Sequence, residues 1–312
     1  MTTNRHREAI AFLAELVAAR SPNPPGDETA VAKLILRKAT ELGLPQPKLH
    51  ARVPHRPNLI ITIGSGAPKL MLAAHMDTVP PGDIAAWRTD PFKLEEVDGR
   101  LYGLGAADMK ASIAAMLFAA QRIARAPEPS GTLTLIFSAD EENGSAYGME
   151  WLAAEGLLVA DGAAMTEPSG AGEKSWERLF VAQRGHCVSW LSARGEPGHS
   201  GMLVPRERRA SYAFVKALDA LLGSDPFAEW VHPVDGTRPT LNVATMVEGG
   251  MIPFAHPPEL RACIEVRVIE GMTEEMVRDR LRAVVASAGL ADRVSIEPAP
   301  APTNWISPGE QV

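Results

Sequence analysis

The chain has 312 residues, and its 31 Lys and Arg residues against 38 Asp and Glu residues give a net charge of −7 at pH 7. An acidic balance argues against a nucleic-acid partner, because nucleic-acid binding normally needs a basic surface to neutralise phosphates. With 46% hydrophobic and 22% charged residues, the composition is that of a globular protein and not of a disordered or fibrous chain. The length suggests about two domains.

Neither a membrane span nor a secretory leader is predicted. The longest apolar run, residues 113–120, is far shorter than the roughly 20 residues that a spanning helix needs. The N-terminal residues MTTNRHREAI contain no apolar leader segment. The two cysteines, Cys187 and Cys263, cannot build a disulfide framework. We therefore expect a cytoplasmic protein with no membrane and no nucleic-acid partner.

The first half of the chain alternates helical and strand patterns. Apolar residues at three- and four-residue steps between Ile10 and Val17 predict a helix that ends at the proline-rich segment 21–26. Further helices are predicted over 28–42 and 110–125. Short apolar runs predict strands over residues 59–63, 70–74, 132–139 and 162–166. This alternation predicts an α/β domain with a mixed, largely parallel sheet flanked by helices.

From about residue 176 the strands become longer and show one polar face. The predicted elements, in order, are a strand over 179–193, a helix over 207–222, strands over 240–247 and 259–268, a helix over 274–288 and a strand over 293–297. The order β-α-β-β-α-β predicts an inserted α+β, ferredoxin-like domain. We expect a first domain at 1–177, the inserted domain at 178–297, and the start of a return to the first domain at 298–312.

Acidic and histidine side chains follow the ends of several predicted elements of the first domain. They are His75, Asp77, Asp108, Glu141, Glu142 and Glu167. Ligands of an open α/β sheet bind at the carboxyl ends of its strands, so these side chains are expected to share one site. Nitrogen and oxygen donors of this kind bind metal ions, and an imidazole ligand usually has a carboxylate behind it that fixes its tautomer.

Each signal also has a structural interpretation. A lone histidine is more often a structural residue than a ligand, an acidic pair favours a helix N-terminus, and Asp108 suits an N-cap. The pair Gly103 and Gly105 superficially suggests a dinucleotide-binding loop, but Asp108 stands where the third glycine belongs and would repel a pyrophosphate. An oxidoreductase that binds NAD is therefore a distant alternative. The co-occurrence of the acidic clusters favours the metal site.

Five motifs occur in order along the chain: HMDTVPPGD, RLYGLGAADMKAS, SADEENGS, TEPSG and GEPGHSG. Together they resemble the dinuclear-zinc peptidase and deacylase family of acetylornithine deacetylase, succinyl-diaminopimelate desuccinylase, aminoacylase and carboxypeptidases. The resemblance covers roughly residues 12–294. It implies a zinc-peptidase-like α/β domain with an inserted lid domain, through which a homodimer is expected.

The resemblance also implies roles for individual residues. His75 and Glu167 would bind one zinc, Asp108 would bridge two zinc ions, and Glu142 would bind the second, with Co²⁺ as a possible substitute. Asp77 would orient His75, and Glu141 would be the general base. In the lid, His199 would stabilise the oxyanion across the dimer, while Arg184, Arg267 and Asn242 would contact the substrate, the arginines by pairing with its carboxylate.

The chain departs from the family pattern at its end. Family members continue after the lid and supply a last histidine for the second zinc, whereas the last histidine here is His256. The second site then has only Asp108 and Glu142, below the three protein ligands usual for a catalytic zinc. We expect a truncated form of the enzyme, or one that another chain completes.

The predicted function is zinc-dependent hydrolysis of the amide bond of an N-acylated amino acid or small peptide. The runs LYGLG and PTLN, with the GGM pattern at residues 249–251, are closest to acetylornithine deacetylase. A desuccinylase and a carboxypeptidase-like dipeptidase stay open, because specificity depends on pocket contacts that motifs do not reveal. A non-catalytic metal-binding relative is the alternative from another class.

Overall fold

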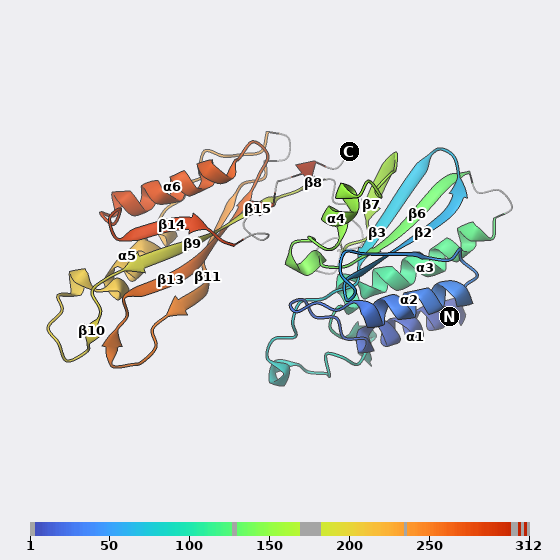
Figure 1. Ribbon diagram of the computed structural model, residues 1–312, viewed down its shortest axis with the longest axis horizontal. Helices are drawn as coiled ribbons and strands as arrows, with labels where there is room; N and C mark the ends of the chain where they lie inside the picture. The colour runs from blue at the N-terminus through green and yellow to red at the C-terminus, as the bar shows by residue number, and fades with distance from the viewer. Residues whose placement is uncertain are drawn as a thin grey trace. The chain divides into compact units, whose positions relative to one another are not determined.

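The computed structural model describes residues 4–126, 130–168, 182–233, 236–300, 305–306 and 309–310. The chain divides into two compact units, Met1–Leu179 and Phe180–Val312 (Figure 1). The expected domain boundaries at residues 177 and 297 stay predictions. Among the described helices, none combines the length and the apolar character that crossing a membrane requires.

The first unit is built on a five-stranded mixed sheet with the strand order β1-β2-β6-β3-β7. Its strands are β1 (Lys48–Ala51), β2 (Pro57–Ser65), β3 (Lys69–His75), β6 (Gly131–Ser138) and β7 (Gly162–Met165). β3 runs parallel to both β6 and β7, whereas β1 with β2 and β2 with β6 are antiparallel. The predicted mixed α/β sheet is confirmed, and its parallel part carries the candidate site.

Three helices cover one face of this sheet (Figure 1). They are α1 (Asn4–Ala18), α2 (Thr29–Glu41) and α3 (Ala111–Ala124). The buried core between helices and sheet includes Phe12, Ile35 and Leu117 from the helices and Leu135 and Phe137 from β6. Each such side chain stabilises the fold by about 1.5–3 kcal/mol through removal from water.

The opposite face of the sheet has a smaller core. Ile60, Met71, Ala73 and Ile136 pack there with Leu152 of the short helix α4 (Met149–Ala154). Because side chains of a strand alternate between its faces, Ile136 packs here while its neighbours Leu135 and Phe137 face the three helices. Burial on both faces explains why β6 is an almost continuous apolar run.

Some short elements of the first unit were not predicted. The strands β4 (Glu95–Val97) and β5 (Arg100–Tyr102) form a hairpin around Asp98 and Gly99, whose φ values are 52° and 74°. An Asp-Gly pair with two positive φ angles is a favoured two-residue hairpin turn. β1, α4 and the short turns η1 (Ile84–Ala86), η2 (Ala106–Lys110) and η3 (Glu141–Asn143) are likewise too short for periodicity to reveal.

The second unit confirms the ferredoxin-like prediction. Its main elements are β9 (Gly185–Arg194), α5 (Ala210–Leu222), β11 (Thr240–Gly249), β13 (Glu259–Val268), α6 (Glu274–Ser287) and β14 (Val294–Pro298). The sheet order is β11-β13-β9-β14, with every pairing antiparallel. α5 and α6 pack on a core that includes Phe214, Leu221, Ile264 and Leu281.

Several short strands complete the second unit. β10 (Gly198–His199) pairs with β12 (Ala255–His256), and β8 (Ala182–Gln183) pairs with β16 (Gly309–Glu310). β15 (Trp305–Ile306) pairs with β9. The turn η5 (Arg206–Arg208) precedes α5. The predicted strand over 179–193 corresponds in the described residues to β8 and β9, while residues 179–181 lie outside them.

Candidate metal centre

Three parallel strands bring the predicted acidic and histidine residues to one edge of the first sheet. His75 is the last residue of β3 and pairs with Ser138 at the end of β6. The turn η3, which carries Glu141 and Glu142, begins three residues after the end of β6, and Glu167 follows β7 by two residues. The sheet therefore gathers residues that are up to 92 positions apart in the sequence.

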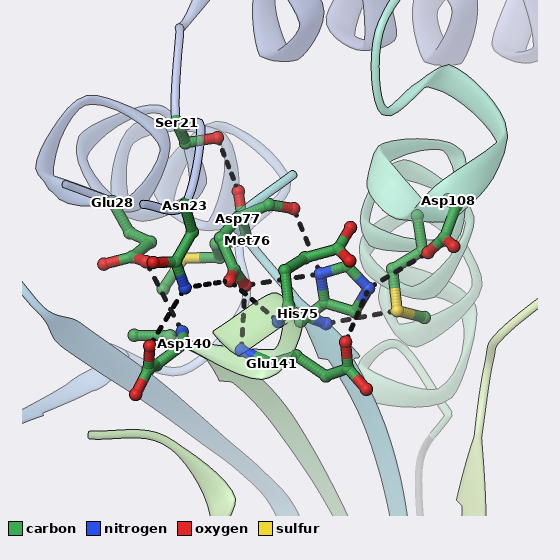
Figure 2. Close-up of polar contacts among 12 residues, drawn as sticks. Ser21, Asn23, Glu28, His75, Met76, Asp77, Asp108, Asp140 and Glu141 are labelled. Atoms are coloured by element: carbon green, nitrogen blue, oxygen red, sulfur yellow. Dashed lines mark hydrogen bonds and ion pairs between the residues drawn. The ribbon is translucent and has the colours of Figure 1, made fainter. Parts of the chain in front are cut away.

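The His75 ring is almost fully buried, at 1% exposure, and acidic groups lie on both sides of it (Figure 2). Its Nε2 is 3.0 Å from an oxygen of Asp108 and 3.2 Å from an oxygen of Glu167. Its Nδ1 is 3.0 Å from the main-chain oxygen of Asp77 and 3.4 Å from that residue's carboxylate. One ring nitrogen thus faces the acidic edge and the other faces the protein interior.

His75, Asp108 and Glu167 form the group that is suited to holding a metal ion. One donor atom from each residue lies within 4.8 Å of the other two. Asp108 and Glu167 are partly exposed, with 56% and 32% of their side chains accessible, so the site is open on one side. Three protein ligands drawn from imidazole and carboxylate groups, with an open position, are the arrangement expected of a catalytic zinc site.

The electrostatics of this group favour a positive charge between the carboxylates. Burial lowers the pKa of the His75 imidazole, but hydrogen bonds with Asp108, Asp77 and Glu167 outweigh it and raise that pKa above its ordinary value. The hydrogen bond with His75 holds the pKa of Asp108 below its usual range. A site that favours a proton on the imidazole in this way offers the same negative environment to a metal cation.

Asp77 is fully buried behind His75 and has several partners. Its carboxylate accepts hydrogen bonds from the backbone N–H groups of Glu141 at 3.1 Å and Glu142 at 3.0 Å. Burial raises the pKa of Asp77, but the contact with His75 and the hydrogen bonds from Asn23 and Glu142 leave it below its ordinary value. Asp77 therefore connects the His75 ring to the turn that carries both glutamates.

Glu141 and Glu142 differ in their surroundings. The carboxylate of Glu141 is 42% exposed and lies 3.9 Å from His75 Nε2. Burial raises the pKa of Glu141, and the nearby carboxylates add to the rise. Glu142 accepts a hydrogen bond from the backbone N–H of Val79 at 3.1 Å, and burial raises its pKa to about 7. Glu142 is outside the three-residue group, so its predicted role as a metal ligand stays a prediction.

The sequence analysis missed several buried polar residues near the site. Lys110 is 1% exposed and donates to the main-chain oxygen of Ala19 at 2.9 Å, and burial lowers its pKa to about 8. Asn23 and Arg56 are also buried, and they contact Asp77 and Asp140, respectively. Asn23 belongs to the proline-rich segment 21–26, which in the sequence predicted only the end of a helix.

The four predicted substrate-binding residues lie in the second unit. Asn242 donates to Glu265 at 2.7 Å, and Arg267 lies 2.6 Å from the other oxygen of the same carboxylate. Arg184 donates to Thr240 and to the main-chain oxygen of Arg238, both at 3.3 Å. His199 is exposed on β10, and its Nδ1 accepts from the backbone N–H of Gly201 at 3.1 Å. Their predicted roles stay predictions.

Comparison with solved structures identifies the fold. The chain superposes on a metallo-carboxypeptidase of the M20 family from Sulfolobus solfataricus with a TM-score of 0.77 and 20% identity, covering 97% of this chain and 79% of that one. Human carnosine dipeptidase 1 gives a TM-score of 0.71 with 17% identity, covering 98% and 79%. At these identities the likeness concerns the fold alone.

Sequence comparison finds relatives named succinyl-diaminopimelate desuccinylase. The protein of Thioalkalivibrio sulfidiphilus is 32% identical over 289 residues, which cover 91% of this chain and 74% of the relative. A Xanthomonas campestris protein is 42% identical over 242 residues, covering 76% and 62%. The chain thus spans between about six tenths and three quarters of these curated relatives.

The profile of Peptidase family M20/M25/M40 matches residues 71–295, a range that begins in β3 and ends in β14. It includes His75, Asp108, Glu141 and Glu167, and so spans every member of the group described above. With the fold and the relatives in agreement, the predicted family is confirmed: the chain belongs to peptidase family M20/M25/M40.

Proposed function

We propose that this chain is a zinc-dependent amidohydrolase that removes the acyl group from an N-acylated amino acid or small peptide. The observation that carries the proposal is the meeting of His75, Asp108 and Glu167 within 4.8 Å, with the partly exposed carboxylate of Glu141 beside them. The relatives named succinyl-diaminopimelate desuccinylase favour an N-succinyl substrate.

The donor atoms fit a zinc ion. His75 Nε2 and one oxygen each from Asp108 and Glu167 would hold it, and the contact of Nδ1 with Asp77 fixes the ring so that Nε2 stays directed to the site. Asp108 has a second carboxylate oxygen and would share it with a second ion, to which Glu142 would also bind. Cobalt prefers the same donors and would be a substitute.

The reaction needs a nucleophilic water and a proton carrier. A bound divalent metal supplies Lewis acidity, which lowers the pKa of water at the site and polarises the amide carbonyl. Glu141 takes up the proton of the attacking water and delivers it to the leaving amine. Burial raises its pKa, and a rise is the direction that favours proton uptake by a general base.

The second unit would supply substrate contacts. Arg267 and Asn242 both contact the carboxylate of Glu265, so their donors lie near enough to one another to engage one carboxylate. A substrate carboxylate would compete for these donors and for Arg184. We further propose that His199 stabilises the oxyanion in a homodimer that forms through this unit, and that the enzyme works in the cytoplasm.

Metal content and hydrolysis test the proposal together. Purified protein is dialysed, its zinc per chain is measured by elemental analysis, and hydrolysis of N-succinyl and N-acetyl amino acids and of dipeptides is assayed with and without a chelator. We expect at least one zinc per chain and hydrolysis that chelation abolishes and zinc restores. Folded protein without zinc would contradict the proposal, and zinc without turnover would support the non-catalytic alternative.

A further inference from the structure

A buried polar cluster lies next to the metal centre, outside the set of residues to which the preceding sections give a chemical role. Its members are Asn23, Glu28, Arg56 and Asp140, and none is more than 3% exposed. Arg56 forms ion pairs with Asp140 and, at 3.4 Å, with Glu28. The four residues come from the segments before α2, just before β2 and just after β6, so the fold brings them together from distant parts of the first unit.

Asn23 connects this cluster to the metal centre (Figure 2). Its side-chain amide donates to Asp77 at 2.8 Å and to Asp140 at 2.9 Å. Its side-chain oxygen faces Arg56 Nη1 at 3.5 Å. The backbone of Asn23 is fixed as well, because its N–H donates to the main-chain oxygen of Thr78 at 2.8 Å. Asn23 therefore holds two carboxylates in place with one rigid group.

Both of those carboxylates lie at the turn η3. Asp77 accepts the N–H groups of Glu141 and Glu142, while Asp140 immediately precedes the turn. Asp140 has a φ of 64°, a left-handed conformation that is uncommon for residues other than glycine. Its side chain is held by Arg56 and Asn23 and by the N–H of Tyr147 at 3.1 Å. These contacts offset the cost of the left-handed backbone.

Stability alone does not explain the cluster. Two buried carboxylates, those of Glu28 and Asp140, pair with one guanidinium, and Glu28 Oε2 and Arg56 Nε have no hydrogen-bond partner within the described residues. Buried ion pairs of this kind are often no more stabilising than apolar residues of the same volume. Gly26 has a φ of 78°, and a β-carbon there would lie 1.0 Å from Arg56 Nη1, so the chain leaves room for this arginine.

We infer that Asn23 and Arg56 are positioning residues that fix the turn carrying Glu141 and Glu142, so that Glu141 stands at the metal centre. The expected effect on kcat rests on the proposed function. The expected effect on the position of the turn does not. Neither residue touches the donor atoms of His75, Asp108 or Glu167 in the contacts described, so both act through Asp77 and Asp140.

The test compares two substitutions of a buried amide. Asn23→Leu removes the link to the turn, whereas Gln121→Met removes an amide of α3 that donates to the main-chain oxygen of Leu42 at 3.1 Å, away from the site. Each variant is assayed for kcat and KM, for thermal unfolding, and for hydrogen–deuterium exchange of the peptide that spans residues 139–145. Exchange reports the turn directly, with or without turnover, since Glu141 and Glu142 donate their amides to Asp77.

For Asn23→Leu we expect kcat to fall about 30-fold with KM within about threefold, as for a misplaced catalytic group. We expect exchange of the turn to become about tenfold faster through local opening, while Gln121→Met changes either quantity by less than about twofold. Arg56→Lys keeps the positive charge but loses the planar guanidinium with its several N–H donors. It should change kcat and turn exchange in the same direction as Asn23→Leu but by less. If Asn23→Leu does not fold, Asn23→Ser is measured in its place, because its hydroxyl can serve only one carboxylate at a time.

The outcomes separate the two proposals. A folded Asn23 variant with unchanged turn exchange and unchanged kcat would overturn the positioning role and leave the proposed function standing. Faster turn exchange in Asn23→Leu than in the parent, together with a parent that hydrolyses no N-acyl substrate, would support the positioning role and contradict the proposed function. Equal losses in Asn23→Leu and Gln121→Met would show a general effect on stability and would also overturn the inference.

Discussion

At the scale of single residues, His75 and Asp77 have separate tasks although only Met76 stands between them. His75 directs Nε2 to the acidic edge, and Asp77 lies behind the ring and holds the turn with both glutamates. Two side chains of an extended segment at positions i and i+2 point to the same side, which explains how one short motif supplies both the ligand and its support.

Asp77→Asn tests this support. The substitution keeps the shape of the side chain but removes the charge that faces His75 Nδ1 at 3.4 Å. We expect the zinc affinity to fall by about 10- to 100-fold, the usual effect of losing the partner of a metal-binding histidine. Competition with a chelator measures it. Asp161→Asn is the matched control, because Asp161 also accepts a backbone N–H, that of Lys69 at 2.7 Å, but is exposed. If Asp77→Asn and Asp161→Asn bound zinc with equal affinity, the proposed support of His75 by Asp77 would be refuted.

At the scale of elements, the sheet of the first unit holds the site through the packing of β6. Leu135 of this strand is fully buried under the helices, whereas Leu70 of the neighbouring strand β3 is 46% exposed. We expect Leu135→Ala to lower the free energy of unfolding by about 2–5 kcal/mol, because the smaller side chain would leave a cavity that the surrounding core fills only in part. We expect Leu70→Ala to cost far less. Urea unfolding measures both, and similar losses would contradict the assigned core.

The cluster that joins α2, β2 and β6 predicts a pH dependence of stability. Burial raises the pKa of Glu28 from 4.5 to about 7 despite the neighbouring Arg56. The folded protein then holds this proton more tightly than the unfolded chain does. The resulting stabilisation is complete below about pH 4.5 and is lost as the pH rises through about 7, by at most about 3 kcal/mol.

Glu28→Gln should remove this part of the dependence. We expect the free energy of unfolding of the variant to fall less between pH 5 and pH 8 than that of the parent, as measured by urea unfolding at each pH. Glu15→Gln, at a half-exposed ion pair with Arg37, serves as the control and should keep the slope of the parent. A parent and a Glu28→Gln variant with the same slope would show that Glu28 is ionised in the folded protein throughout.

Local patterns were sufficient for most of the regular elements but not for the short ones. The helix α1 was predicted from apolar residues at three- and four-residue steps, and α3 from its alanine-rich composition. The strands β3 and β6 were predicted from short apolar runs bounded by breakers. The hairpin of β4 and β5 has three residues a strand and an exposed face, so periodicity does not reveal it. Its Asp98-Gly99 turn was the available signal, and it was overlooked.

The residues of the candidate site likewise divide into those that local sequence patterns reveal and those that they do not. His75, Asp108 and Glu167 were predicted to act together because each follows an element of the α/β pattern or lies at a helix start. Asn23 and Arg56 were missed, because their value lies in contacts with Asp77 and Asp140 across 54 and 84 positions of the chain. A buried arginine cannot be told from an exposed one without knowing which segments meet.

At the scale of the whole molecule, each unit has a hydrophobic core of its own. The first core is formed by residues between Phe12 and Phe137, and the second by residues between Cys187 and Ile296. The metal group lies entirely in the first unit. Because a ligand stabilises only the part that folds to bind it, zinc should act on one unit and not on the other.

Calorimetry tests this division. We expect two unfolding transitions, of which zinc raises only the one that belongs to the first unit. At a free zinc concentration of 100 times the dissociation constant, the gain is about 2.7 kcal/mol for a single site. His75→Ala should abolish the gain and leave the other transition unchanged. A zinc effect on both transitions would mean that the units unfold together, and the lack of any effect would argue against a metal site.

The most direct test of the account is the hydrolysis rate of Glu141→Gln, measured together with its zinc content. Glu141 is outside the group of donor atoms but within 3.9 Å of His75 Nε2, so its loss should leave the metal in place and remove the proton carrier. We predict zinc content equal to that of the parent and a kcat lower by about 10²–10⁴-fold, the usual range for general base catalysis. A variant that keeps both its zinc and its full hydrolysis rate would contradict the account.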